Sequence, residues 1–285
     1  MTTIPSRPYA IIKTGLPSVT QVLEELSKPG LRWAAARETA NFAVHHPGEW
    51  MHLSDEQAVD KLYRHHGGVW ASRAAMGTLL HRCLEYLASG RDLSPEVVDT
   101  LLRTAMQNTK DCRLWWQEPY DKVHERVLGY VNGLEEFWQD YAPEGVASEV
   151  VVRSPGNYIG TADLYATLND DPRYTLLDLK TTAQQGDGKG FYADSYSLQL
   201  HAYAHATERI HYDIDQGRVV EAGTRALAMP QRLAVLHLQG NTRYTLWEIP
   251  LTRGTFDQFM ALLQVHRWRK NPPKARLILR ESAIL

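Results

Sequence analysis

The spacing of apolar residues along the chain predicts an α/β protein. Runs rich in apolar and β-branched residues predict strands at 147–153, 158–168, 174–181, 232–239 and 243–249. Helical spacing predicts helices at 18–45, broken at Pro29 and Gly30, and at 55–65, 72–88, 94–107, 119–141, 191–209 and 252–269. Strands grouped around a helix, with further helices on both sides, indicate a mixed central β-sheet flanked by helices and preceded by an N-terminal helical elaboration.

Two of these strands are predicted to pair as a hairpin, because the sequence NDDPR at 169–173 favours a tight turn. If the turn is centred between Asp170 and Asp171, paired positions sum to 341, which sets Asp163 opposite Asp178. Lys180 then shares their face, since side chains alternate along a strand. The apolar residues of the hairpin are expected on the other face: Ala162, Leu164, Ala166, Leu177 and Leu179.

Two facing carboxylates beside a lysine favour a cation site. Their repulsion is relieved by proton uptake or by a divalent ion, and hard oxygen ligands suit Mg²⁺ or Mn²⁺. A neighbouring lysine can hold a phosphate oxygen or orient a water activated by the metal. The alternative is a surface hairpin with an ordinary Asp–Lys pair of little energetic weight.

Two predicted helices add candidates. In the helix at 191–209, Gln199 and Tyr203 lie on one stripe, which either lines a groove or packs against the sheet. In the helix at 72–88, His81 lies beside a buried stripe made by Leu80, Cys83, Leu84 and Leu87. Gly77, one turn earlier, costs about 1 kcal/mol relative to alanine, which suggests close approach of a backbone or a ligand. The alternative for His81 is a half-buried histidine paired with a carboxylate.

In chain order, the segments MGTLLH (76–81), GTADLYA (160–166), LLDLKTT (176–182) and LQLHAYA (198–204) resemble RecB-like nucleases of the PD-(D/E)xK superfamily. The resemblance spans residues 73–203. It implies a restriction-endonuclease-like core within one nuclease domain over residues 1–285. We expect 1–70 to be the helical elaboration, 71–270 the core and 271–285 a basic tail.

The resemblance also assigns roles. It implies that His81, Asp163, Asp178 and the Leu179 carbonyl bind one or two Mg²⁺ or Mn²⁺ ions, and that Lys180 assists the attacking water. Two further residues are implied to contact DNA or to brace the site, namely Gln199 and Tyr203. Glu149, on the preceding strand, matches an acidic position often seen in such proteins and is a secondary candidate.

The function implied is a metal-dependent DNA exonuclease of the phage and bacterial type, acting on single strands or ends in recombination, repair or end processing, with a recombination protein as an expected partner. The alternatives are an endonuclease of the same fold, a non-catalytic DNA-binding or nuclease-inhibiting protein, and an RNA-directed nuclease, because no base-reading module separates DNA from RNA. Retention of Lys180 with both aspartates argues against the non-catalytic alternative.

Cysteine content and hydropathy bear on the expected cofactor and on the compartment of the protein. Some RecB-like relatives bind an iron–sulfur cluster through four cysteines, whereas this chain has only Cys83 and Cys112, so we expect no cluster. Two cysteines without evident pairing, no signal sequence and no long apolar run predict a cytoplasmic protein without membrane insertion.

The net charge of −2 argues against a globally basic nucleic-acid binder, although phosphate affinity needs only a local patch. The acid-free stretch His266 to Arg280 is either that patch or a solvated helix end.

Trp115 and Trp116 either stack on bases or belong to the core. Two motifs are set aside: GDGKG (186–190) departs from a phosphate loop, and the pair His201 and His205 is expected to be a surface pair rather than a zinc site.

Overall fold

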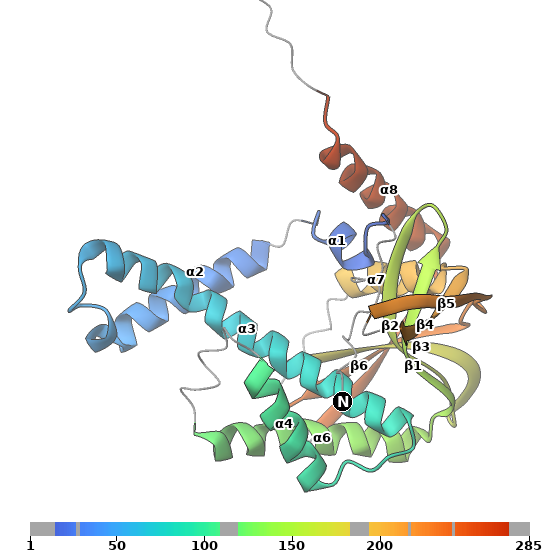
Figure 1. Ribbon diagram of the computed structural model, residues 1–285, viewed down its shortest axis with the longest axis horizontal. Coiled ribbons are helices and arrows are strands. Elements are labelled where there is room, and N and C mark those ends of the chain that lie inside the picture. The colour runs from blue at the N-terminus through green and yellow to red at the C-terminus, as the bar shows by residue number, and fades with distance from the viewer. Residues whose placement is uncertain are drawn as a thin grey trace, which may run out of the picture.

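A mixed β-sheet forms the centre of the protein in the computed structural model (Figure 1), which describes residues 15–26, 29–108, 119–182, 194–215, 218–240 and 243–273. Within these residues the strand order is β5-β4-β1-β2-β3-β6-β7. All neighbouring strands pair antiparallel except β3 and β6, which are parallel. The predicted α/β class with a mixed sheet is confirmed.

The strands are β1 Glu144–Ser154, β2 Tyr158–Leu168, β3 Asp171–Thr182, β4 Glu208–Asp215, β5 Arg218–Ala226, β6 Arg232–Gln239 and β7 Arg243–Ile249. The helices are α1 Val19–Leu23, α2 Pro29–His45, the 3₁₀ turn η2 Pro47–Glu49, α3 Asp55–Ala88, α4 Pro95–Asn108, α6 Tyr120–Tyr141, α7 Asp194–Ala204 and α8 Arg253–Lys270.

Both faces of the sheet are covered by apolar clusters. On one side, α3, α4 and α6 pack against strand residues that include Leu164 and Leu177. On the other side, α1, α7 and α8 pack against residues that include Ala162, Tyr165 and Leu176. Our expectation of one polar and one apolar face of the hairpin is therefore wrong in part. Ala162 packs on the α7 side rather than with Leu164, and the face that carries the aspartates is also largely core.

Two features of the N-terminal helices differ from the prediction. A break was expected at Pro29, but α2 begins there, because the first position of a helix needs no backbone N–H from proline. The separate helices 55–65 and 72–88 are one helix, α3, which continues through Gly67 and Gly68. Each glycine in a helix costs about 1 kcal/mol. This cost is offset because α2 packs on the first half of α3, while α4 and α6 pack on the second half.

The sheet also contains two strands that the sequence pattern did not predict. The helix predicted to reach residue 209 ends at Ala204, and β4 begins at Glu208. Together β4 and β5 form one margin of the sheet, where the described β5 side chains are mostly exposed. A margin strand needs fewer apolar residues than a central one, so its sequence signal is weak.

His201 is buried rather than on the surface, which corrects the expectation of a surface histidine pair. Its Nδ1 donates to the Ser197 carbonyl at 2.7 Å, and its Nε2 accepts the Thr252 backbone N–H at 3.0 Å. Burial lowers the pKa of His201, which keeps the ring neutral and suited to both bonds. His205 stacks on Phe256 with ring centroids 4.0 Å apart. The two histidines therefore join α7 to the start of α8.

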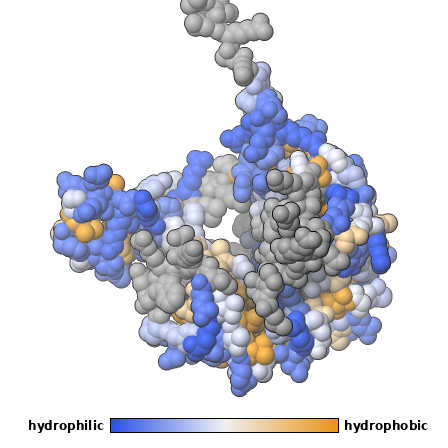
Figure 2. All heavy atoms as spheres, in the orientation of Figure 1, coloured by the Kyte–Doolittle hydropathy of each residue, from blue (hydrophilic) through white to orange (hydrophobic). Residues whose placement is uncertain are grey.

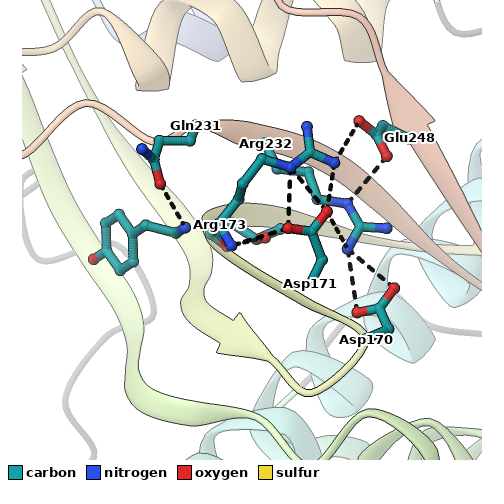
Figure 3. Close-up of polar contacts among 8 residues, drawn as sticks. Asp170, Asp171, Arg173, Gln231, Arg232 and Glu248 are labelled. Atoms are coloured by element: carbon teal, nitrogen blue, oxygen red, sulfur yellow. Dashed lines mark hydrogen bonds and ion pairs between the residues drawn. The ribbon is translucent and has the colours of Figure 1, made fainter.

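A charged network fixes the turn between β2 and β3 (Figure 3). Arg232 on β6 donates to both carboxylate oxygens of Asp170 at 3.3 Å and to Glu248 on β7 at 3.2 Å. Arg173 bonds Asp171 and Glu248 in turn. Each exposed pair contributes little alone. Because the Arg232 side chain is only 9% exposed, we assign the network the role of holding the β2–β3 hairpin against β6 and β7.

The crossing of β2 and α7 leaves no room for a side chain at Gly160. A Cβ there would lie 2.5 Å from the buried Tyr203 ring and 3.2 Å from Val19. We expect Gly160→Ala to destabilise the fold by about 2 kcal/mol, because a tightly packed core tolerates extra volume poorly. Chemical denaturation would measure this, with Gly223→Ala as a control, since a Cβ at Gly223 meets nothing within 4 Å. Equal stability of the two variants would contradict the packing argument.

Candidate active site

The β2–β3 hairpin has the register that the sequence predicts. Leu164 pairs with Leu177 and Tyr165 with Leu176, so paired numbers sum to 341. The turn itself is shifted, since Leu168 pairs with Asp171, and an irregularity after Ala166 restores the expected register. Extended by one residue, this register would set Asp163 opposite Asp178, but the described backbone pairing ends at Leu164, so that pair stays a prediction.

The side chain of Asp163 continues the contact between β2 and β3 where the pairing ends. Its Oδ2 accepts the backbone N–H of Leu179 at 2.7 Å. That bond orients the carboxylate, and the side chain is only 9% exposed. Its other oxygen, Oδ1, lies 3.5 Å from Nδ1 of His81. One aspartate thus bridges the central strand to helix α3.

Three side chains from three elements converge around Asp163. His81 comes from α3, Glu149 from β1 and Asp163 from β2, and one potential ligand atom from each lies within 4.8 Å of the others. His81 Nδ1 is 3.5 Å from Glu149 Oε1. Glu149, the secondary candidate of the sequence analysis, therefore lies as close to His81 as Asp163 does.

Glu149 has an unusual backbone. Its φ of +48° falls in the left-handed region, which costs a residue with a Cβ about 1–2 kcal/mol. The pairs on either side, Ser148 with Leu164 and Val150 with Ala162, keep one register, so the irregularity is confined to this residue. Strain of this kind concentrates at functional sites.

We expect Glu149→Gly to be about 1 kcal/mol more stable than Glu149→Ala, because glycine adopts positive φ without steric cost. Both variants should lose metal affinity, since each removes the same carboxylate. Thermal denaturation would compare their stabilities, and calorimetric Mn²⁺ titration would compare their affinities. If alanine were the more stable, the backbone at this position would not be strained.

Asp178 and Lys180 form a second, more deeply placed pair. Asp178 is 1% exposed, and Nζ of Lys180 lies 2.5 Å from its Oδ2. Apart from this ion pair, neither carboxylate oxygen has a hydrogen-bond partner among the described residues. Lys180 also lies 5.0 Å from the ring centroid of Tyr196 on α7, a cation–π contact. The carboxylate retains capacity to accept further bonds or to bind a cation.

Electrostatic interactions connect the cluster of His81, Glu149 and Asp163 with the Asp178–Lys180 pair. Burial lowers the pKa of His81, but the charges of Asp163 and Glu149 outweigh it and raise that pKa to about 9. Burial raises the pKa of Asp178 to about 6, although Lys180 acts in the opposite direction. Burial lowers the pKa of Lys180, but Asp178 and Asp163 outweigh it and raise the pKa, so the side chain is an ammonium.

Gln199 and Tyr203 contact each other on α7. The Gln199 Nε2 donates to the Tyr203 hydroxyl at 3.1 Å. Tyr203 is 3% exposed and its ring packs over Gly160. Of the two roles considered for this pair, bracing the site is the one that a buried tyrosine favours. Tyr196, one turn before Gln199, belongs to the same stripe, and its contact with Lys180 is apparent only in the folded chain.

The donor set fits a divalent cation. Two carboxylates and one imidazole converge, and a buried aspartate with unused acceptor capacity lies on the adjoining strand. Like charges held this close are expected to bind a cation or a proton. The role of the Leu179 carbonyl as a ligand stays a prediction.

The remaining sequence candidates are placed only in part. Arg267 donates to the carbonyls of Gly156 and Asn157, and Arg269 forms an ion pair with Glu25, so both help attach α8 to the body. Residues 274–285, the GDGKG loop, Cys112 and the two adjacent tryptophans lie outside the described residues.

Cys83 is buried and is a free thiol. None of the described helices combines the length and apolar character needed to cross a bilayer.

The site has a lysine beside acidic residues on the inner strands of a mixed sheet. The sequence model described as "PD-(D/E)XK nuclease superfamily" matches residues 50–266. The chain belongs to this superfamily.

Other comparisons add little. No curated protein matches the chain. A solved structure titled "Crystal structure of SSO0001" is similar over 69% of this chain and 86% of its own, with 16% identity and a TM-score of 0.30. A score that low supports no conclusion about this chain.

Proposed function

We propose that this protein is a divalent-metal-dependent nuclease that hydrolyses phosphodiester bonds of DNA, acting as an exonuclease in recombination, repair or end processing. The observation that carries the proposal is the convergence of His81, Glu149 and Asp163 beside the buried Asp178–Lys180 pair. Membership of the nuclease superfamily supports the same reaction class.

Each residue has a distinct task in the proposed reaction. Glu149, Asp163 and the His81 imidazole, which must lose its proton to act as a ligand, would hold a divalent ion, with Asp178 as a further ligand. Such an ion, when bound, supplies a water of lowered pKa and neutralises charge on the phosphate. Lys180, kept as an ammonium by its acidic neighbours, donates to a phosphate oxygen or orients the attacking water. Asp178 and Tyr196 hold the lysine in place.

The His81 imidazole affects which divalent ion the site prefers. Because nitrogen ligands suit softer ions better than Mg²⁺, His81 favours Mn²⁺ relative to an all-oxygen site. Both ions remain part of the proposal, as do sites for one or for two ions.

The test is cleavage of end-labelled single-stranded and double-stranded DNA, closed circular DNA and RNA, with Mg²⁺, Mn²⁺ or EDTA. Wild-type protein is compared with Lys180→Ala. We expect metal-dependent loss of linear DNA only, absent in the variant. Cutting of closed circles would indicate an endonuclease, and loss of RNA alone an RNA-directed enzyme. Binding without cleavage by the wild type in both metals would refute the catalytic proposal.

A further inference from the structure

Residues 29–70 form an arm of α2, η2 and the first half of α3 that extends away from the sheet (Figure 1). Phe42 is the buried side chain of this arm among those described, and it stacks on His65 with centroids 3.8 Å apart. Apolar surface is visible on the arm in Figure 2. Its exposed large apolar residues are Trp33, Val44, Met51, Val59 and Tyr63.

Helix α3 connects the arm directly to the candidate active site. Tyr63 and His81 are separated by about five turns of an ideal helix, so they lie on the same side of α3, about 27 Å apart. Trp70 and Gly77 fall near the same line at helical spacing. The face of α3 that presents His81 to Glu149 and Asp163 thus continues outward to Tyr63.

Aromatic rings occupy the outer part of this face. Tyr63, 72% exposed, meets His66 with ring centroids 6.0 Å apart, and His66 meets the half-buried Trp70 at 5.2 Å. Both contacts are edge to face. An edge-to-face contact covers at most one face of one of the two rings, so a flat group of a ligand can stack on the opposite face.

The charge of α3 suits an anionic ligand. From Lys61 to Leu84 the helix contains no aspartate or glutamate. Arg73 is exposed and forms no ion pair among the described residues. The other cations of this stretch are paired with acids outside it, namely Lys61, Arg64 and Arg82. Arg73 is therefore the cation available between the rings and His81.

Gly77 leaves the inner part of the face open. A Cβ at Gly77 would meet nothing within 4 Å, so no described backbone or side chain requires a glycine there. Gly67 and Gly68 are equally open. Close packing within the protein does not explain these helix-weakening residues, whereas close approach of a ligand does.

We propose that the face of α3 from Tyr63 to Gly77 is a track on which a single-stranded nucleic acid lies as it enters the site at His81. This inference rests on the proposed nuclease function. Bases would stack on Tyr63 and Trp70, Arg73 would contact a phosphate, and Gly77 would let the backbone pass close to the helix. Stacking on protein rings requires base faces that a duplex keeps covered, so the track selects single strands.

The test is the affinity of the full chain for labelled oligothymidylate and oligouridylate in EDTA, measured by fluorescence anisotropy. We expect Tyr63→Ala and Trp70→Ala each to bind at least about fivefold more weakly. Arg73→Ala should bind more weakly with a shallower dependence on salt. The matched control is Trp33→Ala, an exposed tryptophan on α2, which should bind like the wild type. A duplex of equal length should be bound less well.

Tyr63 is largely exposed, so its replacement tests the track even if Trp70→Ala is unstable. Normal affinity of the Tyr63 variant, or a loss confined to Trp268→Ala on α8, would overturn the proposal and place the strand elsewhere. Unchanged nucleic-acid affinity in all track variants would instead favour a protein partner for the arm. If the wild type cleaves DNA while the variants bind normally, only the track fails. If the variants lose affinity but the wild type never cleaves, only the proposed function fails.

Discussion

Replacing Asp163 with asparagine is expected to lower the rate of metal-dependent cleavage by at least about a thousandfold, equivalent to about 4 kcal/mol of transition-state stabilisation. The variant should still fold. An asparagine oxygen can accept the Leu179 N–H that Asp163 now accepts at 2.7 Å, and the two side chains have nearly equal volume. What is lost is the negative charge next to His81 and Glu149.

The matched control is Asp170→Asn, the same substitution on the same hairpin. Asp170 lies at the turn, is 40% exposed and bonds Arg232 (Figure 3). It should retain wild-type cleavage. Mn²⁺ titration by calorimetry should show weaker binding for Asp163→Asn and no change for Asp170→Asn. Wild-type cleavage by the Asp163 variant would remove this residue from the catalytic centre.

Replacing Lys180 with alanine is expected to destabilise the metal-free protein by about 3 kcal/mol near pH 8, because it leaves the buried Asp178 carboxylate without its cation. The loss should be smaller near pH 5. Burial already raises the pKa of Asp178 to about 6, and removing Lys180 raises it further above the value near 3.9 of an unfolded chain. A raised pKa in the folded state favours folding at low pH and loses that effect as pH rises through it.

Denaturation in EDTA at both pH values would measure the difference. Two further variants serve as controls. Asp178→Asn combined with Lys180→Ala should depend less on pH, since the titrating carboxylate is gone. Replacing both residues with leucine should recover part of the stability, because apolar residues often replace a buried ion pair without loss. A pH-independent cost for Lys180→Ala would show that Asp178 is not the group left uncompensated.

The local features of the hairpin could be predicted because they depend on neighbours in sequence. The turn residues at 169–173 and the alternation of side chains predicted an antiparallel hairpin, and its central register is the expected one, although an irregularity after Ala166 offsets a shifted turn. The spacing of Asp178 and Lys180 is internal to one strand, so their proximity does not depend on the rest of the fold. Strands β2, β6 and β7 were predicted with the observed bounds for the same reason.

The continuity of α3 and the identity of β4 depended on packing. Gly67 and Gly68 weaken a helix locally, yet contacts with α2 and with the body on either side keep α3 continuous. The segment after Ala204 has a helix-like apolar pattern, but pairing with β1 turns residues from Glu208 into a strand. Long-range pairing outweighs local preference where that preference is weak.

The sequence by itself determined the superfamily motifs, the pair of strands that carries Asp163, Asp178 and Lys180, and the helix that carries His81. Only the tertiary structure brought Glu149 into contact with His81, through a strained backbone on a strand far from that helix in sequence. It also placed Tyr196 against Lys180. The physical reason is that a strand or helix fixes the spacing of its own residues, whereas distances between elements are decided by how the sheet and helices pack.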